Sequence, residues 1–246
     1  MFPVRVWLWV ALLGLTWTAA ATGQDAVGNA LAALRDVTPE GYGLQRACNQ
    51  LEQLRDDGAA GIPLLRQHVE HFHRRAERTD YVASRLKLLL AERQQLAFSS
   101  SQLQARNRLI SLDAEIRALE QERARPGQPT AKALRAFLFR AAGCIGLVGG
   151  GAVEEARDYL VRLAKHRDPA LRFAGLFGLT AFCRNNMDQA PIVEPLLRNA
   201  LQDSDQDIRR AANACLTYLR EEDKKLSVRW RGVSAGLEVK KVKKRK

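Results

Sequence analysis

The sequence has few of the residues and patterns that β-sheets require. β-Branched residues are sparse and show no sustained alternation with polar residues, so we expect little or no sheet. Glycine and proline are scarce through most of the chain, which is instead rich in Ala, Leu, Arg, Gln and Glu. This composition favours helix. The chain has 246 residues, of which 46% are hydrophobic, so we expect one folded domain with appendages rather than a disordered protein.

Familiar enzyme motifs are also missing. There is no nucleophile elbow, no phosphate-binding loop and no His-Glu-x-x-His segment. The glycines at 149–151 do not follow a predicted strand, which excludes a dinucleotide-binding loop. We therefore expect a protein that is not an enzyme and that binds no cofactor.

Cysteine is rare, and no CxxC pair occurs. The spacing of the four cysteines favours buried thiols, although an exported chain would permit a disulfide. These cysteines are Cys48, Cys144, Cys183 and Cys215.

Long apolar runs are absent except at the N-terminus. The run "VWLWVALLGLTW" at 6–17 has 12 residues, fewer than the roughly 20 that span a membrane. Arg5 precedes the run, and the small residues of "TAAATGQD" follow it. We predict a signal peptide over 1–23, cleaved after Ala21 or Gly23, and hence a bacterial protein that is periplasmic or secreted. An uncleaved membrane anchor is the alternative.

Positive charge is concentrated at the C-terminus. Of the net charge of +12, residues 223–246 carry +8, because they hold ten Lys or Arg against two acidic residues. In an exported protein such a tail favours an anionic lipid or polymer of the envelope over nucleic acid, and a solvated end is the alternative. The candidate residues for that anionic surface are Lys240, Lys241, Lys243, Lys244, Arg245 and Lys246.

A helical repeat occupies the second half of the chain. The segment "DPALRFAGLFGLTAF" from Asp168 aligns with "DQDIRRAANACLTYL" from Asp205 at an offset of 37 residues. Apolar and small residues at i, i+4, i+7, i+8 and i+11 form one face of a helix in each. The small residues let a neighbouring helix approach closely, and the aspartates mark helix starts. A third copy is "FRAAGCIGLVGG", and "ACNQLEQL" with "IPLLRQHV" forms a fourth.

These units resemble the HEAT-repeat family, in its bacterial HEAT-like form with phycobilisome-lyase-type repeats. The resemblance covers about 127–222 and, with fewer matching positions, about 30–75. It implies an all-α fold in which helix pairs stack into an α-solenoid. It also implies a groove, formed by the second helices of the pairs, that binds another protein. We expect Arg172, Arg209 and Arg210 to be exposed there and to contact an acidic partner.

An insertion separates the repeats. Apolar residues from Leu86 to Leu119 follow helical and heptad spacing, interrupted by three serines at 99–101. This pattern predicts one long helix or a helical hairpin, either packed along the solenoid or projecting as an arm that binds a partner. The expected organisation is a signal peptide at 1–23, an N-terminal unit at 24–80, an arm at 81–125, repeats at 126–222 and a basic tail at 223–246.

Three of the four histidines lie in "PLLRQHVEHFHRR". Leu65, Val69 and Phe72 form the predicted buried stripe of a helix here. His68 and His71 are three residues apart and form a reserve metal pair, but a site needs a third ligand and His73 faces another way. We expect no metal, and interpret the cluster as a helix end. The alternatives to a protein-binding scaffold are a metal-dependent or bilin-handling enzyme and an envelope adaptor that acts through the tail.

Overall fold

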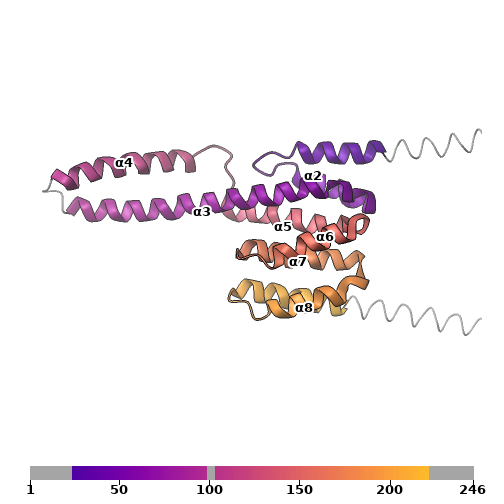
Figure 1. Ribbon diagram of the computed structural model, residues 1–246. Helices are drawn as coiled ribbons and strands as arrows, with labels where there is room; N and C mark the ends of the chain where they lie inside the picture. Colours follow the sequence, from indigo (N-terminus) through magenta and orange to yellow (C-terminus); the bar gives the residue numbers. More distant parts are fainter. Residues whose placement is uncertain (1–23, 99–102, 222–246) are drawn as a thin grey trace, which may run out of the picture.

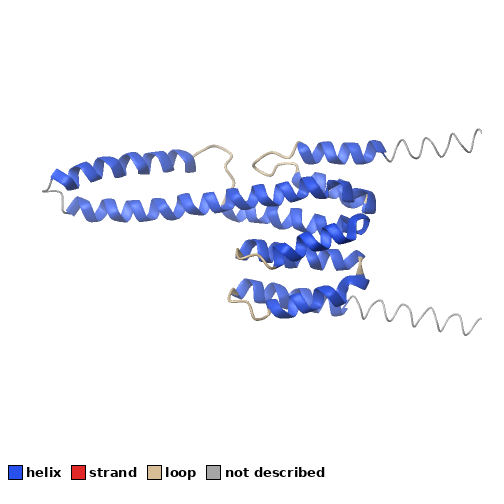
Figure 2. Cartoon of the chain, in the orientation of Figure 1, coloured by secondary structure: helices blue, strands red, loops and turns tan. Residues whose placement is uncertain are grey.

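The computed structural model describes residues 24–98 and 103–221, and the fold of this part is all-α, without strands (Figure 2). The all-α class expected from the composition is confirmed. The helices are the segment 24–35, α2 (Leu44–Gln53), η1 (Arg55–Gly61), α3 (Ile62–Phe98), α4 (Leu103–Arg123), α5 (Ala131–Val148), η2 (Gly149–Ala152), α6 (Val153–Ala164), α7 (Pro169–Asn185), η3 (Met187–Gln189), α8 (Ala190–Ala200) and the segment 206–221.

Most of these helices lie in a stack of helix pairs (Figure 1). Helix α5 packs against α2, α3 and α7, and α7 packs in turn against α6 and α8. One hydrophobic core runs from Ala30 to Leu219 through all of them. The pairs are 24–35 with α2, α3 with α5, α6 with α7, and α8 with 206–221. The second helix of each pair aligns with the others in the sequence repeat.

Aspartate side chains cap the start of the last two second helices, α7 and 206–221. Asp168 Oδ1 accepts hydrogen bonds from the backbone N–H groups of Ala170 and Leu171, at 2.8 and 3.1 Å. Asp205 Oδ1 accepts from Asp207 and Ile208 in the same way, 37 residues later. Each such cap is worth about 1 kcal/mol. The helix starts expected at the two aspartates are therefore confirmed.

Glycines allow the close approach of helices that the repeat pattern predicts. A Cβ added to Gly175 would lie 2.7 Å from Ala164 Cα of α6, and one added to Gly178 would lie 2.8 Å from the Ala142 carbonyl oxygen of α5. Gly146 of α5 faces the backbone of α7 in the same manner. The α5–α7 contact is thus made by backbone against backbone, which leaves no room for side chains.

The insertion is a helical hairpin that projects from the stack (Figure 1). Helix α3 begins in the stack and continues into the arm as one helix of 37 residues, and α4 returns beside it. The hairpin alternative is the correct one. The arm has a separate small core of residues at heptad spacing from both helices: Val82, Leu86, Leu89, Leu112, Ile116 and Leu119.

One expectation about α3 is wrong. The histidine segment is not a helix end, because α3 continues for 23 residues beyond Arg75. The unit boundary expected after residue 80 falls within this helix, between Ala76, the last α3 residue in the core of the stack, and Val82, the first in the core of the arm. Ala76, Val82 and Leu86 are buried and carry the apolar stripe from the stack into the arm, so nothing stops the helix there.

The four cysteines are buried thiols without disulfides, as their spacing predicted. Burial raises the pKa of the Cys183 thiol to about 12. A thiol with such a pKa is protonated at neutral pH and is a poor nucleophile.

The predicted signal peptide and the basic tail lie outside the described residues. Among the described residues, the stretch Ala131–Ala164 is long and apolar enough to meet the length and composition criteria for a membrane span. It includes α5, which lies at the centre of the hydrophobic core, and the turn at Gly149–Ala152.

Candidate functional site

An apolar groove runs along α7, beside the segment 206–221. It has a volume of about 450 Å³. Phe177, with 46% of its surface exposed, lies against Gly143 of α5, where any side chain would displace the ring. From Phe173 to Arg184 the groove follows about three turns of helix, or roughly 16 Å. Its lining residues are Leu147, Phe173, Phe177, Thr180, Ala181, Arg184, Ala211, Ala214, Cys215 and Tyr218.

A second hollow adjoins this groove at the start of the helices. It has a volume of about 780 Å³, and it shares Phe173, Ala211 and Ala214 with the groove. Arg210 lines it, is 69% exposed, and lies 3.5 Å from Asp207. Of the three arginines expected to contact a partner, Arg210 is therefore the one that the structure places at this surface.

The other two arginines hold loops of the stack together. Arg172 donates to the backbone carbonyls of residues 166 and 167, and Arg209 donates to those of 203 and 204. These carbonyls are again 37 residues apart, so the repeated arginine has a repeated structural contact. Arg172 also pairs with Asp203 of the next unit at 2.8 Å. The expectation that Arg172 is exposed is wrong, since its side chain is 17% exposed.

The reserve metal pair is directed at the backbone. His68 Nε2 lies 2.8 Å from the carbonyl oxygen of Leu34, and His71 Nε2 lies 3.4 Å from that of Pro39. Burial lowers the pKa of His68, which favours the neutral ring. Both histidines thus help to attach α3 to the helix and loop that precede α2.

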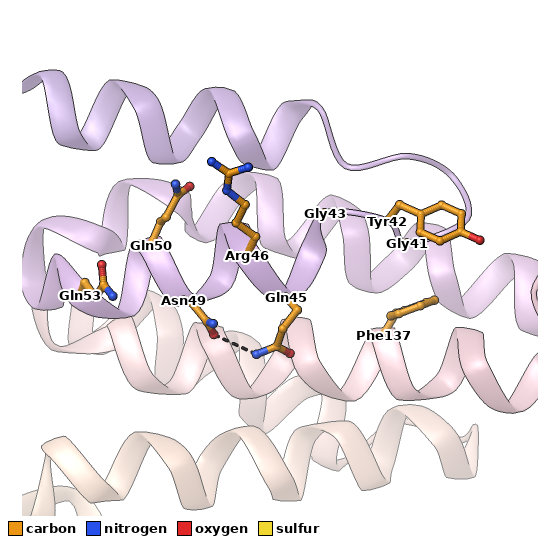
Figure 3. A pocket seen from close by; sticks show the side chains of 9 residues that line it. All are labelled: Gly41, Tyr42, Gly43, Gln45, Arg46, Asn49, Gln50, Gln53 and Phe137. Carbon is orange, nitrogen blue, oxygen red and sulfur yellow. Dashed lines mark hydrogen bonds between the residues drawn. The ribbon is translucent and has the colours of Figure 1, made fainter.

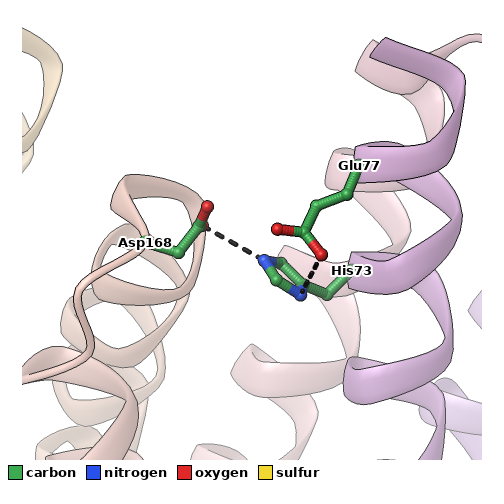
Figure 4. Close-up of side chains that lie close together, drawn as sticks. All are labelled: His73, Glu77 and Asp168. Carbon is green, nitrogen blue, oxygen red and sulfur yellow. Dashed lines mark ion pairs between the residues drawn. The ribbon is translucent and has the colours of Figure 1, made fainter. Parts of the chain in front are cut away.

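The helical spacing placed His73 away from the reserve metal pair. In the structure it lies in a cluster of possible metal ligands with Glu77 and Asp168 (Figure 4). Its Nδ1 is 3.6 Å from Glu77 Oε2, and its Nε2 is 3.2 Å from Asp168 Oδ1. The ring of His166 lies 6.4 Å from that of His73, between centroids. The i,i+4 spacing of His73 and Glu77 is visible in the sequence, but their proximity to Asp168, 95 residues later, is not.

A third candidate is a shallow pocket between α2 and α5 (Figure 3). It has a volume of about 660 Å³, with Tyr42 and Phe137 along one side. Gly41, at a φ of 90°, lies directly on the Phe137 ring, and only glycine fits that conformation and contact. The side-chain amides of Gln45 and Asn49 bond to each other at 2.8 Å. Gln50, also in the lining, has a buried Oε1 without a hydrogen-bond partner among the described residues.

Comparison with known proteins adds no information about the function. No family model, curated protein or solved structure matches the chain.

Proposed function

We propose that the chain is an exported, non-enzymatic scaffold of the HEAT-repeat type, and that it binds another protein through the groove along α7. The apolar lining of that groove supports the proposal. Phe173, Phe177 and Tyr218 place aromatic rings on a surface formed by second helices, and aromatic residues dominate the energetics of protein interfaces.

The groove suits an amphipathic helix with an acidic end. A groove between two parallel ridges of side chains accepts the apolar stripe of a helix, and about three turns fit between Phe173 and Arg184. Arg184 is exposed at one end of the groove, where it would meet a carboxylate of the partner. We therefore take the partner to be a protein with an exposed helix that is apolar on one face and acidic at one end.

Site-specific photocrosslinking tests the proposal. A crosslinking amino acid replaces Phe177 in the groove or, as the control, Ile192 of α8, which is exposed to a similar extent at 50%. In cells of the source organism, position 177 is expected to yield one defined crosslinked protein that position 192 does not yield.

Binding of the purified partner completes the test. The variant Phe177→Asp should weaken binding by roughly 10–100-fold, the equivalent of losing one buried aromatic side chain, and Ile192→Asp should not change it. Circular dichroism would establish that both variants are folded. Equal crosslinking at the two positions, or unchanged affinity of Phe177→Asp, would contradict the groove as the binding surface.

A further inference from the structure

The His73 cluster joins two elements that are far apart in the sequence. His73 and Glu77 are on successive turns of α3, in the stacked part of that helix, and Asp168 caps the N-terminus of α7. His166 lies two residues before Asp168, in the loop between α6 and α7. The side chains of His73, Glu77 and Asp168 therefore meet between the second and third helix pairs, with the His166 ring nearby.

The geometry of His73 is not that of a hydrogen-bonded histidine. Its Nε2 is buried and has no hydrogen-bond partner among the described residues, although Asp168 Oδ1 is 3.2 Å away. Zinc binds nitrogen and oxygen at about 2.0–2.2 Å, so two ligand atoms of a tetrahedral site lie about 3.3–3.6 Å apart. The Asp168 carboxylate therefore lies about as far from His73 Nε2 as a second ligand of one ion would.

The charges around the cluster favour a cation. Glu77 and Asp168 supply two carboxylates, and two arginines that lie close to them in the sequence have other partners. Arg75 contacts the Pro39 carbonyl and Glu40, and Arg172 pairs with Asp203. The two backbone N–H groups that cap α7 both bond to Oδ1 of Asp168, which leaves its Oδ2 available to a metal.

His166 supports the cluster without being a ligand. Its Nδ1 accepts a hydrogen bond from the Asp168 backbone N–H at 3.0 Å, so the neutral ring carries its proton on Nε2 and has no lone pair left for a metal. This hydrogen bond holds the loop that carries Asp168 in place beside His73. Water would therefore complete the coordination of an ion bound by the other three residues.

We propose that His73, Glu77 and Asp168 form a binding site for Zn²⁺ or a similar divalent transition metal, which clamps α3 to the start of α7. One imidazole and two carboxylates are nitrogen and oxygen ligands that such an ion accepts, and water would complete the four-coordinate geometry. The site is separate from the groove, and it would stabilise the stack without taking part in partner binding.

The test is a zinc titration of the purified full chain after treatment with a chelator. Calorimetry at pH 7.5 should show one zinc ion bound per chain. With zinc at 100 times its dissociation constant, the midpoint of thermal unfolding should rise by roughly 5–10 °C. Co²⁺ at the same site should give the visible spectrum of a tetrahedral complex.

Three variants assign the site. His73→Asn and Asp168→Asn should each lose zinc binding and the rise in melting temperature. The second keeps an asparagine cap on α7 and thus a folded helix start. His71→Asn, on the same helix but outside the cluster, should behave as the wild type.

Two results would overturn the proposal. The first is the absence of stoichiometric zinc binding, or binding that His73→Asn and Asp168→Asn leave intact. The second is a melting temperature that zinc does not change.

Discussion

The stack of helix pairs and the arm are both made of antiparallel helices, yet their helices meet in different ways. In the stack, α5 is covered on several sides and buries nine residues, four of which are alanine or glycine: Leu134, Leu138, Ala141, Ala142, Gly143, Cys144, Ile145, Gly146 and Val148. In the arm, α4 buries Leu112, Ile116 and Leu119 along a single stripe. Helix α5 therefore depends on close packing around it, and α4 depends on one stripe.

The pairing of charged residues between helices is a second feature of the arm. Along one side of the arm, Arg78 pairs with Glu122, Arg85 with Glu115, and Glu92 with Arg108, at distances of 2.7–2.9 Å. On α3 these residues are seven apart, so each heptad contributes one ion pair. Such exposed pairs select the register of two helices more than they stabilise them. The stack also has ion pairs between helices, such as Arg140 with Glu52, but there the close contacts of glycine with the backbone of the facing helix constrain the packing as well.

The largest expected effect comes from adding a side chain where the backbones of α5 and α7 are in contact. A Cβ on Gly146 would overlap the Gly178 carbonyl and lie 2.8 Å from the Phe182 backbone nitrogen. Gly146→Val should therefore destabilise the fold by about 3 kcal/mol or more and lower the thermal midpoint by roughly 10 °C, as measured by circular dichroism.

A matched glycine substitution serves as the control. A Cβ on Gly28, in the segment 24–35, meets no atom within 4 Å, so Gly28→Ala should leave the midpoint unchanged or raise it slightly. If Gly146→Val has the same thermal midpoint as the wild type, the stability of the fold does not depend on the backbone contact between α5 and α7.

An intermediate effect is expected from the arm's own core. Leu112→Ala removes a fully buried side chain, at a cost of about 2–3 kcal/mol, the lower part of the usual range because the two helices of the arm can close around the gap. Because the core of the arm is separate from that of the stack, the loss should be confined to the arm. Hydrogen exchange read by mass spectrometry should speed up over α4 and the second half of α3 and stay unchanged over α5–α8. The control is Leu138→Ala, in the stack, which should instead speed up exchange across the whole stack. If Leu112→Ala also speeds up exchange in α5–α8, the two regions unfold together.

The smallest effect distinguishes the ion pairs of the two regions. The side chains of Arg172 and Asp203 are 17% and 14% exposed, whereas those of Arg85 and Glu115 are 37% and 39% exposed. Arg172→Met should cost about 2 kcal/mol because it leaves a partly buried carboxylate unpaired, and Arg85→Met should cost roughly 0.5 kcal/mol or less. Urea unfolding of both variants measures the two values.

The Arg172–Asp203 ion pair also predicts how the stability of the stack depends on pH. Burial raises the pKa of Asp203, but hydrogen bonds from Arg172 and from the Asp205 backbone N–H outweigh it and hold the pKa below its usual range. A carboxyl with a lowered folded pKa stabilises the protein above its unfolded pKa of about 4, and this contribution is lost as the pH falls through the folded value. The difference between wild type and Arg172→Met should thus shrink below about pH 4. A constant difference down to pH 2 would contradict the role of this ion pair.

Several features of the fold were predictable because they are local. The i, i+4, i+7 pattern after Asp168 and Asp205 identified the buried faces of α7 and of 206–221, and it placed Gly175 and Gly178 where helices touch. Leu65, Val69 and Phe72 are buried as expected. The arm was harder to predict, because the spacing of apolar residues over Leu109–Leu119 fits either a long helix or a hairpin. The choice between them depends on whether α4 packs against α3.

The candidate site was less predictable. Arg172 and Arg209 resemble surface residues by their spacing, and their contacts with the 165–168 and 201–205 loops depend on how those loops close. Arg210, one residue further along the helix, remains exposed beside the groove. The arrangement of Phe173 and Phe177 with Tyr218 requires two helices 37–45 residues apart to pack side by side.

The amino-acid sequence by itself determined that the chain is helical, that it repeats, and which face of each repeat helix is buried. These properties follow from the spacing of apolar and small residues within one helix. Only the tertiary structure decided that α3 continues into the arm, that Arg172 is tied to Asp203, and that His73 meets Asp168 across two helix pairs. Such contacts join the polar ends and flanks of different helices, and no local periodicity specifies which of them will meet.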